Sequence, residues 1–244
     1  PSMGLEKCSQ IQNGAGSQRL GGKPARFKDV QSGIKTAAVQ DLVAAGEPAG
    51  PAAPPSRRSI DLDLAALIYT SGTTAKPKGV MMTHLNMVSA ATSVIEYLRL
   101  TSDDIILTVL PLSSSYGLYQ LLTAFQIGAT LVLERSFAYP HVVLQQLTLE
   151  KVTGFAIVPT IAAMLLQLDL SAYQFTSLRY LTNAGAALPV EHVPRLQAVF
   201  PHTQLFLMYG LTECKRVSFL DPDQVAFRPD SVGKAMPNVE VYIV

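Results

Sequence analysis

The sequence is poor in charge and in cysteine, and each shortage excludes a class of function. Charged residues make up 15% of the 244 residues, against 48% hydrophobic residues, and the formal net charge is only +1. A chain so nearly neutral gives no indication of nucleic acid or of an anionic membrane as a partner. The 2 cysteines, Cys8 and Cys214, are too far apart for a metal or redox motif, and we expect a reducing, cytoplasmic setting.

Long apolar runs and several catalytic motifs are also missing. No apolar run is long enough to span a bilayer, and the first residues lack the apolar core of a secretory signal. The chain contains no Gly-x-Ser-x-Gly elbow of the kind that hydrolases use. The 4 histidines are isolated from any cysteine or carboxylate at ligand spacing, so they predict no metal site. They are His84, His141, His192 and His202.

Residues 1–59 and 60–244 differ in organisation. The first segment is rich in small and polar residues and then in proline, so we expect a flexible lead-in, a short helix over 36–45 and a proline-rich linker. From residue 60, apolar runs of strand length alternate with helical patterns. This alternation predicts an α/β fold, with a layered, largely parallel sheet and helices on both faces. The expected strands are 64–69, 80–82, 105–110, 130–133, 154–158, 178–182, 204–208 and 239–244. The expected helices are 84–97, with Thr83 as its N-cap, 116–126, 141–149, 161–168 and 190–199.

The most informative stretch runs from Tyr69 to Gly79 and reads Tyr-Thr-Ser-Gly-Thr-Thr-Ala-Lys-Pro-Lys-Gly. It lies between two expected strands and therefore forms a loop. Glycine lets the backbone approach a ligand closely, while N–H groups, hydroxyls and lysines bind phosphate oxygens. The spacing from Gly72 to Gly79 does not fit the usual Gly-x-x-x-x-Gly-Lys-Ser/Thr nucleotide loop, and a strand follows instead of a helix. The stretch predicts a different kind of polyphosphate site, and the alternative is a hydroxyl-rich surface loop.

This stretch resembles the signature of the adenylate-forming superfamily, which includes acyl-CoA synthetases, luciferases and peptide-synthetase adenylation domains. Their pattern is Tyr-Thr-Ser-Gly-Thr-Thr-Gly-x-Pro-Lys-Gly, from which this chain departs at Ala75. If that position needs a positive φ, alanine there costs about 1 kcal/mol. A second match, Tyr-Gly-Leu-Thr-Glu, occupies 209–213 directly after an expected strand. The resemblance covers residues 60–244.

The resemblance implies ATP and Mg²⁺ as cofactors and an acyl-adenylate as the first product. A carboxylic acid would attack the α-phosphorus of ATP, and the acyl group would pass to the thiol of CoA or of a carrier protein. Thr212, Glu213 and Lys78 would be catalytic, with Glu213 as the metal ligand. The implied nucleotide-binding residues are Thr70, Ser71, Gly72, Thr73, Thr74, Lys78, Gly185, Ala186, Ala187, Tyr209, Gly210 and Thr212.

The position of these loops gives independent support, because ligands bind at the carboxyl ends of parallel strands. The loops after strands 64–69, 105–110, 178–182 and 204–208 should therefore converge on one crevice. The candidate residues of the substrate pocket are Tyr116, Gly117, Asn183 and Gly233. Leu118 and Tyr119 could line it as well, although ordinary packing of a helix on the sheet explains this segment equally.

The acid itself is expected to be a fatty or other acyl acid. Peptide-synthetase adenylation domains place an Asp near the start of the segment 113–117 to pair with the substrate's ammonium. This chain has no carboxylate there, and a buried ammonium without a partner is costly. The alternative is that the chain is a fragment of an amino-acid adenylation domain, with an amino acid as its substrate.

The family also carries a ribose-binding Asp in a Thr-Gly-Asp segment and a small C-terminal domain with a catalytic lysine. Both lie beyond the last motif matched here. The resemblance therefore implies a partial AMP-binding core, truncated at both ends, with adenylation weak or absent. The alternative is a non-catalytic module that binds nucleotide, acyl-adenylate or a partner protein. Apolar surface left uncovered by truncation predicts possible homo-oligomers.

Overall fold

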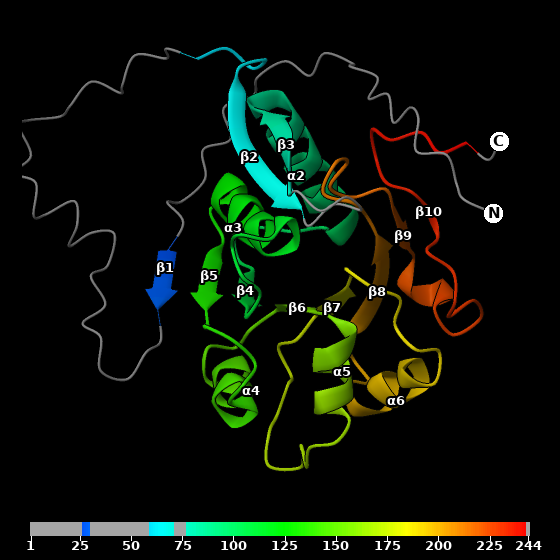
Figure 1. Ribbon diagram of the computed structural model, residues 1–244. Helices are drawn as coiled ribbons and strands as arrows, with labels where there is room; N and C mark the ends of the chain where they lie inside the picture. The colour runs from blue at the N-terminus through cyan, green and yellow to red at the C-terminus, as the bar shows by residue number, and fades with distance from the viewer. Residues whose placement is uncertain (1–25, 30–58, 71–76, 243–244) are drawn as a thin grey trace, which may run out of the picture.

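A computed structural model describes residues 26–29, 59–70 and 77–242, and it confirms the predicted α/β class (Figure 1). One sheet has eight strands in the order β1-β5-β4-β6-β7-β8-β9-β10, and a two-stranded sheet pairs β2 with β3. Neighbours from β1 to β8 run parallel, whereas β9 and β10 are antiparallel additions at one edge. The strands are β1 (Arg26–Asp29), β2 (Leu64–Thr70), β3 (Lys78–Thr83), β4 (Ile105–Thr108), β5 (Thr130–Leu133), β6 (Gly154–Ile157), β7 (Tyr180–Asn183), β8 (Gln204–Tyr209), β9 (Ser218–Leu220) and β10 (Lys234–Ala235). The helices are α2 (His84–Leu98), α3 (Ser115–Ile127), α4 (Pro140–Leu149), α5 (Pro159–Leu165), α6 (His192–Val199) and the short 3-10 helix η1 (Pro222–Gln224).

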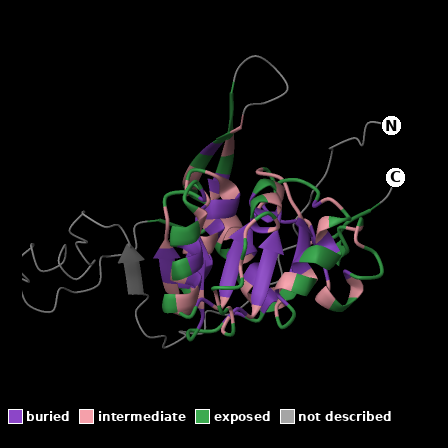
Figure 2. Ribbon diagram, turned by 90° about the horizontal axis from the view of Figure 1, so that it is seen from below, coloured by how far each residue is buried: buried purple, intermediate pink, exposed green. Residues whose placement is uncertain are grey.

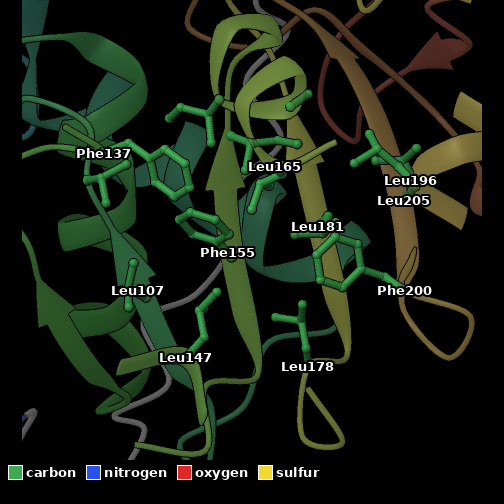
Figure 3. Close-up of a cluster of buried hydrophobic side chains, with 14 of the residues drawn as sticks. Leu107, Phe137, Leu147, Phe155, Leu165, Leu178, Leu181, Leu196, Phe200 and Leu205 are labelled. Carbon is green, nitrogen blue, oxygen red and sulfur yellow. The ribbon is translucent and has the colours of Figure 1, made fainter. Parts of the chain in front are cut away.

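Helices cover both faces of the large sheet. Successive residues of a strand point to opposite faces, so each face packs its own core against the helices. Phe155 and Leu181 join the core beneath α4, α5 and α6, whereas their neighbours Ala156 and Tyr180 join the core beneath α2 and α3. Figure 3 shows the first of these cores, with strand side chains packed against Leu165 of α5 and its neighbours. The strands β4 to β8 of the sheet are therefore mostly buried while the helices expose their outer faces (Figure 2).

The helix that follows the hairpin begins where the sequence predicts. Thr83 is the N-cap of α2: its hydroxyl accepts a hydrogen bond from the Asn86 N–H at 3.2 Å, and the Asn86 side chain accepts one from the Thr83 N–H at 3.2 Å. Ser114 caps α3 in a similar way, accepting from the Gly117 N–H at 3.1 Å. These caps satisfy backbone donors that the first turn of a helix leaves open.

The structure corrects the predicted place of the segment 64–69. This segment forms β2, which pairs antiparallel with β3 and lies outside the large sheet. The hairpin packs against α2 instead (Figure 1). Its side chains explain the difference, since Leu64, Leu67 and Met81 are exposed while Ile68 and Met82 are buried. A strand inside a parallel sheet is buried on both faces.

Three short strands were missed, and the strand expected over 239–244 is wrong for its described residues. Residues 239–242 form no strand, because the chain turns at Asn238 (φ 64°) and is held on α2. Ser93 donates to the Pro237 carbonyl at 2.9 Å, and the Asn238 amide donates to the Ser93 hydroxyl at 3.1 Å. The missed strands are β1, β9 and β10.

Strand β1 falls inside the segment expected to be a flexible lead-in, and it pairs with β5 at the sheet edge. The short helix expected over 36–45 and the proline-rich linker lie outside the described residues. Among the described residues, no helix combines the length and apolar character needed to cross a bilayer.

Candidate nucleotide and acid site

The carboxyl ends of β4, β6, β7 and β8 lie along one edge of the sheet, because these neighbouring strands are parallel. Their register places Ile157 beside Asn183, and Asn183 beside Leu207. The loops that follow β4, β7 and β8 therefore leave the sheet on the same side, as the sequence predicts. This edge, from the loop after β4 to the start of β9, is called the carboxyl edge below.

The loop after β7 is held close to the strand end by Asn183. The Asn183 side-chain amide donates to the Ala186 carbonyl at 3.1 Å, while its Oδ1 atom is buried and has no hydrogen-bond partner. Gly185 adopts a φ of +89°, a conformation that favours glycine. Gly185, Ala186 and Ala187 are all exposed. The predicted adenine-binding bend thus presents backbone and small side chains to solvent, as a flat base requires.

The loop after β8 makes a tight turn that returns directly into β9. A Cβ atom on Gly210 would lie only 2.1 Å from the Lys215 carbonyl oxygen, so this position accepts no side chain without movement of the backbone. The Val217 N–H donates to the Tyr209 carbonyl at 2.9 Å and closes the turn. Thr212 is half-buried and Glu213 is exposed at its tip.

A single exposed carboxylate at this tip suits magnesium better than a preformed metal cage. Mg²⁺ in nucleotide sites takes one or two carboxylates and fills its shell with phosphate oxygens and water. Among the described residues no group of three or more His, Cys, Asp or Glu side chains is placed to hold a metal alone. Glu213 therefore fits a metal that arrives with a nucleotide.

The start of α3 lies against β7 at the same edge. Tyr116 is buried and its hydroxyl donates to the Thr182 carbonyl at 2.8 Å. Burial raises the pKa of Tyr116, against the opposing effects of Arg216 and of a hydrogen bond with Thr182, so the phenol stays protonated. A Cβ atom on Gly117 would lie 2.2 Å from the Pro111 carbonyl oxygen, which explains why glycine occupies this turn of the helix. Tyr116 and Gly117 are therefore at the edge where the substrate pocket was predicted.

Other predicted pocket residues have a clear structural task. Gly233 has a φ of +75°, and a Cβ atom there would lie 2.0 Å from the Phe219 carbonyl oxygen, so it enables the turn into β10. Tyr119 is buried among Ala90 and Ala91 of α2, which is the helix-packing alternative for this residue. Leu118, which lies between Gly117 and Tyr119 in α3, is half-buried.

Only the flanks of the predicted phosphate loop lie in the described part of the chain. Thr70, at the end of β2, pairs with Lys78, the first residue of β3. Thr70 is half-buried and the Lys78 side chain is exposed. The two strands predicted on either side of this loop are thus confirmed. Ser71, Gly72, Thr73, Thr74 and Ala75 lie outside the described residues, so the predicted approach of this loop to Tyr209–Glu213 stays a prediction.

Arg216 is the residue of this edge that the sequence reasoning missed. Its side chain is 5% exposed, and its guanidinium carbon lies 4.5 Å from the centre of the Tyr116 ring. The available signal was a charged residue two positions before the short strand β9. A separate open hollow of about 420 Å³ lies between α6 and residues 226–229, away from all of the predicted site residues.

The comparisons with known proteins agree with this geometry. A model of the AMP-binding enzyme family matches residues 15–244, and the chain belongs to that family. Malonate–CoA ligase ACSF3, mitochondrial, of Bos taurus is 35% identical over 197 residues, which are 74% of this chain and 33% of that protein. The chain thus spans about a third of the length of the curated relatives it matches.

Solved structures show the same fold. The crystal structure of VinN has a TM-score of 0.68 and 38% identity, covering 82% of this chain and 48% of VinN. The o-succinylbenzoate CoA synthetase MenE of Bacillus subtilis, in complex with ATP and magnesium ion, has a TM-score of 0.66 and 31% identity. That match covers 73% of this chain and 37% of MenE.

Proposed function

We propose that this chain supplies the nucleotide and acid site of an AMP-forming ligase. A carboxylate oxygen of the acid attacks the α-phosphorus of ATP, the bond from that phosphorus to the bridging oxygen breaks, and pyrophosphate leaves. The resulting acyl-adenylate is then attacked at its carbonyl carbon by a thiolate, giving a thioester and AMP. The observation that supports this proposal is the gathering of the loops after β4, β7 and β8 at one edge in a chain of the AMP-binding family.

Each loop has a distinct task in the first step. The bend at Gly185–Ala187 receives the adenine, and the ring of Tyr209 stacks against it. The Thr212 hydroxyl donates to the α-phosphate, where negative charge grows as the fifth bond forms. Lys78 and the loop from Thr70 to Thr74 hold the β- and γ-phosphates until they leave as pyrophosphate. Catalysis of this kind depends mainly on positioning and on neutralising charge.

Glu213 would hold Mg²⁺ at this site. The ion neutralises charge on the phosphate oxygens of the nucleotide. Lys215 is the cation nearest in sequence to this carboxylate, and Glu213 opposes the loss of its proton. The loop thus carries both signs of charge within a few residues.

The acid substrate and the thiol acceptor follow from the relatives only at the level of class. The named relatives are ligases of malonate and of 4-coumarate with CoA, and VinN has been solved with L-aspartate. We propose a carboxylic acid as substrate, with CoA or a carrier protein as the acceptor. The absence of a carboxylate in 113–117 continues to favour an acid without an ammonium group at this point of the pocket.

Calorimetry on the 244-residue chain tests the proposal. A non-hydrolysable acyl-sulfamoyl-adenosine should bind with one site and compete with AMP, because both use the bend at 185–187. Thr212→Val should weaken both ligands while leaving the melting temperature nearly unchanged. Pyrophosphate exchange then separates a catalytic unit from a binding module that retains the same loops. Failure of both AMP and the analogue to bind would overturn the proposed function.

A further inference from the structure

Arg216 is a buried cation that lies over an aromatic ring. Its guanidinium carbon lies 4.5 Å from the centre of the Tyr116 ring. Burial raises the pKa of Tyr97 and of Tyr119, and the positive charge of Arg216 opposes this rise at both phenols. Tyr97 in turn stacks on Phe219, with 4.3 Å between the ring centres. The rings orient the guanidinium but carry no negative charge, since burial raises the pKa of Tyr97 and Tyr116.

The described residues supply no carboxylate to balance this charge. Arg179 pairs with Asp104, and Lys234 pairs with Asp221, whereas no carboxylate of the described residues is paired with Arg216. The residue before it, Lys215, is a second cation that is 4% exposed. The Nε atom of Arg216 is buried and has no hydrogen-bond partner. A buried guanidinium without an anion is costly, so its presence calls for an anionic group that the described residues do not provide.

The position of Arg216 indicates which ligand brings that group. It lies over Tyr116 at the start of α3, where the substrate pocket is proposed. The phosphates of a nucleotide are assigned to Thr212, Lys78 and the hairpin loop instead. An apolar tail would leave Nε unpaired, and an ammonium group would be repelled by Arg216. A carboxylate matches the planar fork of a guanidinium with two parallel hydrogen bonds.

We propose that Arg216 binds a second carboxylate of the acid substrate, so that this site selects a dicarboxylic acid. The inference rests on the proposed function, because it assumes that the acid lies at the carboxyl edge. It replaces the expected fatty acid with an acid that carries negative charge at the end remote from the reacting carboxyl. Arg216 then acts as a specificity-determining residue, and Tyr97 and Tyr116 position it.

A matched pair of adenylate analogues tests this charge requirement. Succinyl-sulfamoyl-adenosine and succinamoyl-sulfamoyl-adenosine differ only in a terminal carboxylate against a terminal amide of nearly equal size. Calorimetry should find the succinyl compound about 10- to 100-fold tighter, the range of a charged hydrogen-bonded contact. The glutaryl and glutaramoyl pair repeats the comparison with a longer tail. Equal affinities within both pairs would overturn the proposal.

Variants assign the preference to the side chain. Arg216→Met should abolish the preference for the charged tail but leave AMP affinity unchanged, whereas Arg216→Lys should retain part of it. Arg228→Met, at an exposed arginine away from Tyr116, is the matched control and should retain all of it. If Arg216→Met also weakened AMP binding by a similar factor, the residue would belong to the nucleotide site and the proposal would fall.

Folding and function can be told apart. A thermal melt followed by circular dichroism shows whether Arg216→Met folds, and if it does not, the wild-type analogue pairs and Arg216→Lys decide the question. Failure of AMP to bind the wild-type chain would refute the proposed function itself. Binding of AMP with no preference between charged and neutral tails would refute only the role of Arg216.

Discussion

The two ends of the parallel strands, called the amino edge and the carboxyl edge, differ in whether their buried polar groups have hydrogen-bond partners. At the amino edge, Asp104 precedes β4, Thr153 precedes β6 and Arg179 precedes β7. Asp104 is 3% exposed and accepts from Thr153 at 2.6 Å, from Arg179 at 2.9 Å and from the Thr101 N–H at 2.8 Å. Arg179 also donates to the Leu98 carbonyl at 3.1 Å. This edge is closed, because its charges and hydroxyls satisfy one another.

The carboxyl edge leaves buried polar atoms open. The Oδ1 atom of Asn183, the Nε atom of Arg216 and the hydroxyl of Ser218 are buried without a hydrogen-bond partner. Ser218 pairs with Tyr209 across β8 and β9, so these residues belong to the same end of the strands. Buried polar groups are usually satisfied, and exceptions require an explanation. The contrast shows that the buried polar groups at one edge are satisfied within the fold, whereas the other edge leaves several buried hydrogen-bonding atoms without a protein partner.

Removing the acid of the closed edge should have the largest effect. Asp104→Ala leaves the Arg179 guanidinium without its anion and the Thr153 hydroxyl without its acceptor. We expect the free energy of unfolding to fall by about 3 kcal/mol, measured by urea denaturation. Asp103→Ala, at the exposed neighbouring position, is the control and should change it by less than about 0.5 kcal/mol. A loss of under 1 kcal/mol for Asp104→Ala would show that this edge contributes no more than an exposed one.

Steric demand at the carboxyl edge gives the next effect. Gly117→Ala would bring a Cβ atom to 2.2 Å from the Pro111 carbonyl oxygen, and neither backbone can yield easily. We expect a loss of about 1–3 kcal/mol in the free energy of unfolding. Gly79→Ala, where the added atom would meet only the Tyr69 ring at 3.4 Å, should cost little. Similar losses for the two variants would contradict a specific role for Gly117 in shaping this edge.

The sequence predicted the regular part of the sheet well, because its signals are local. The apolar run 130–133 is β5 to the residue, and Thr83 begins its helix as a hydroxyl N-cap should. The two strands of the hairpin, β2 and β3, were predicted correctly. The prediction that β2 lies among the parallel strands of the large sheet was wrong. The exposed Leu64, Leu67 and Met81 of the hairpin look like core residues in sequence, and only their contacts with the rest of the fold separate the two cases.

The rest depends on contacts distant in sequence. Strands β9 and β10 are short and form only because a neighbouring strand is available to pair with: β9 pairs with β8, and β10 pairs with β9. Arg216 was missed for the same reason, since a charged residue is normally exposed. Its burial requires Tyr97 from α2 and Tyr116 from α3, which lie about a hundred residues earlier in the chain. The motif Tyr209–Glu213 could be recognised in the sequence because its residues are consecutive.

A charge at the tip of the loop after β8 should matter for ligand and not for fold. Glu213→Gln keeps the size of an exposed side chain, so the free energy of unfolding should stay within about 0.5 kcal/mol of wild type. Affinity for ATP in the presence of Mg²⁺ should fall at least about tenfold, whereas affinity for ATP with the metal chelated should not change. Glu240→Gln serves as the exposed control. An equal loss with and without Mg²⁺ would place Glu213 outside the metal site.

The smallest expected effect is on the free energy of unfolding, and it comes from Lys215, the residue before Arg216. Burial lowers the pKa of Lys215 from its ordinary value of 10.5, although Cys214 and Glu213 partly oppose this. Between the lowered pKa and 10.5, the unfolded chain binds more protons than the native chain, so stability rises with pH across that window. Below the window both states are protonated, and the folded state carries the full cost of the buried charge.

Lys215→Met should therefore be more stable than wild type at neutral pH, and its advantage should shrink as the pH approaches 10.5. Denaturant curves collected from pH 7 upward measure this difference. Lys151→Met is the matched control, because Lys151 has a similar left-handed backbone (φ 53° against 56°) but an exposed side chain. Because the Lys151 side chain is exposed, Lys151→Met measures the effect of the same substitution without the loss of a buried charge. A pH-independent difference for Lys215→Met would mean that the ammonium of Lys215 remains solvated, and the carboxyl edge would then hold Arg216 as its one costly cation among the described residues.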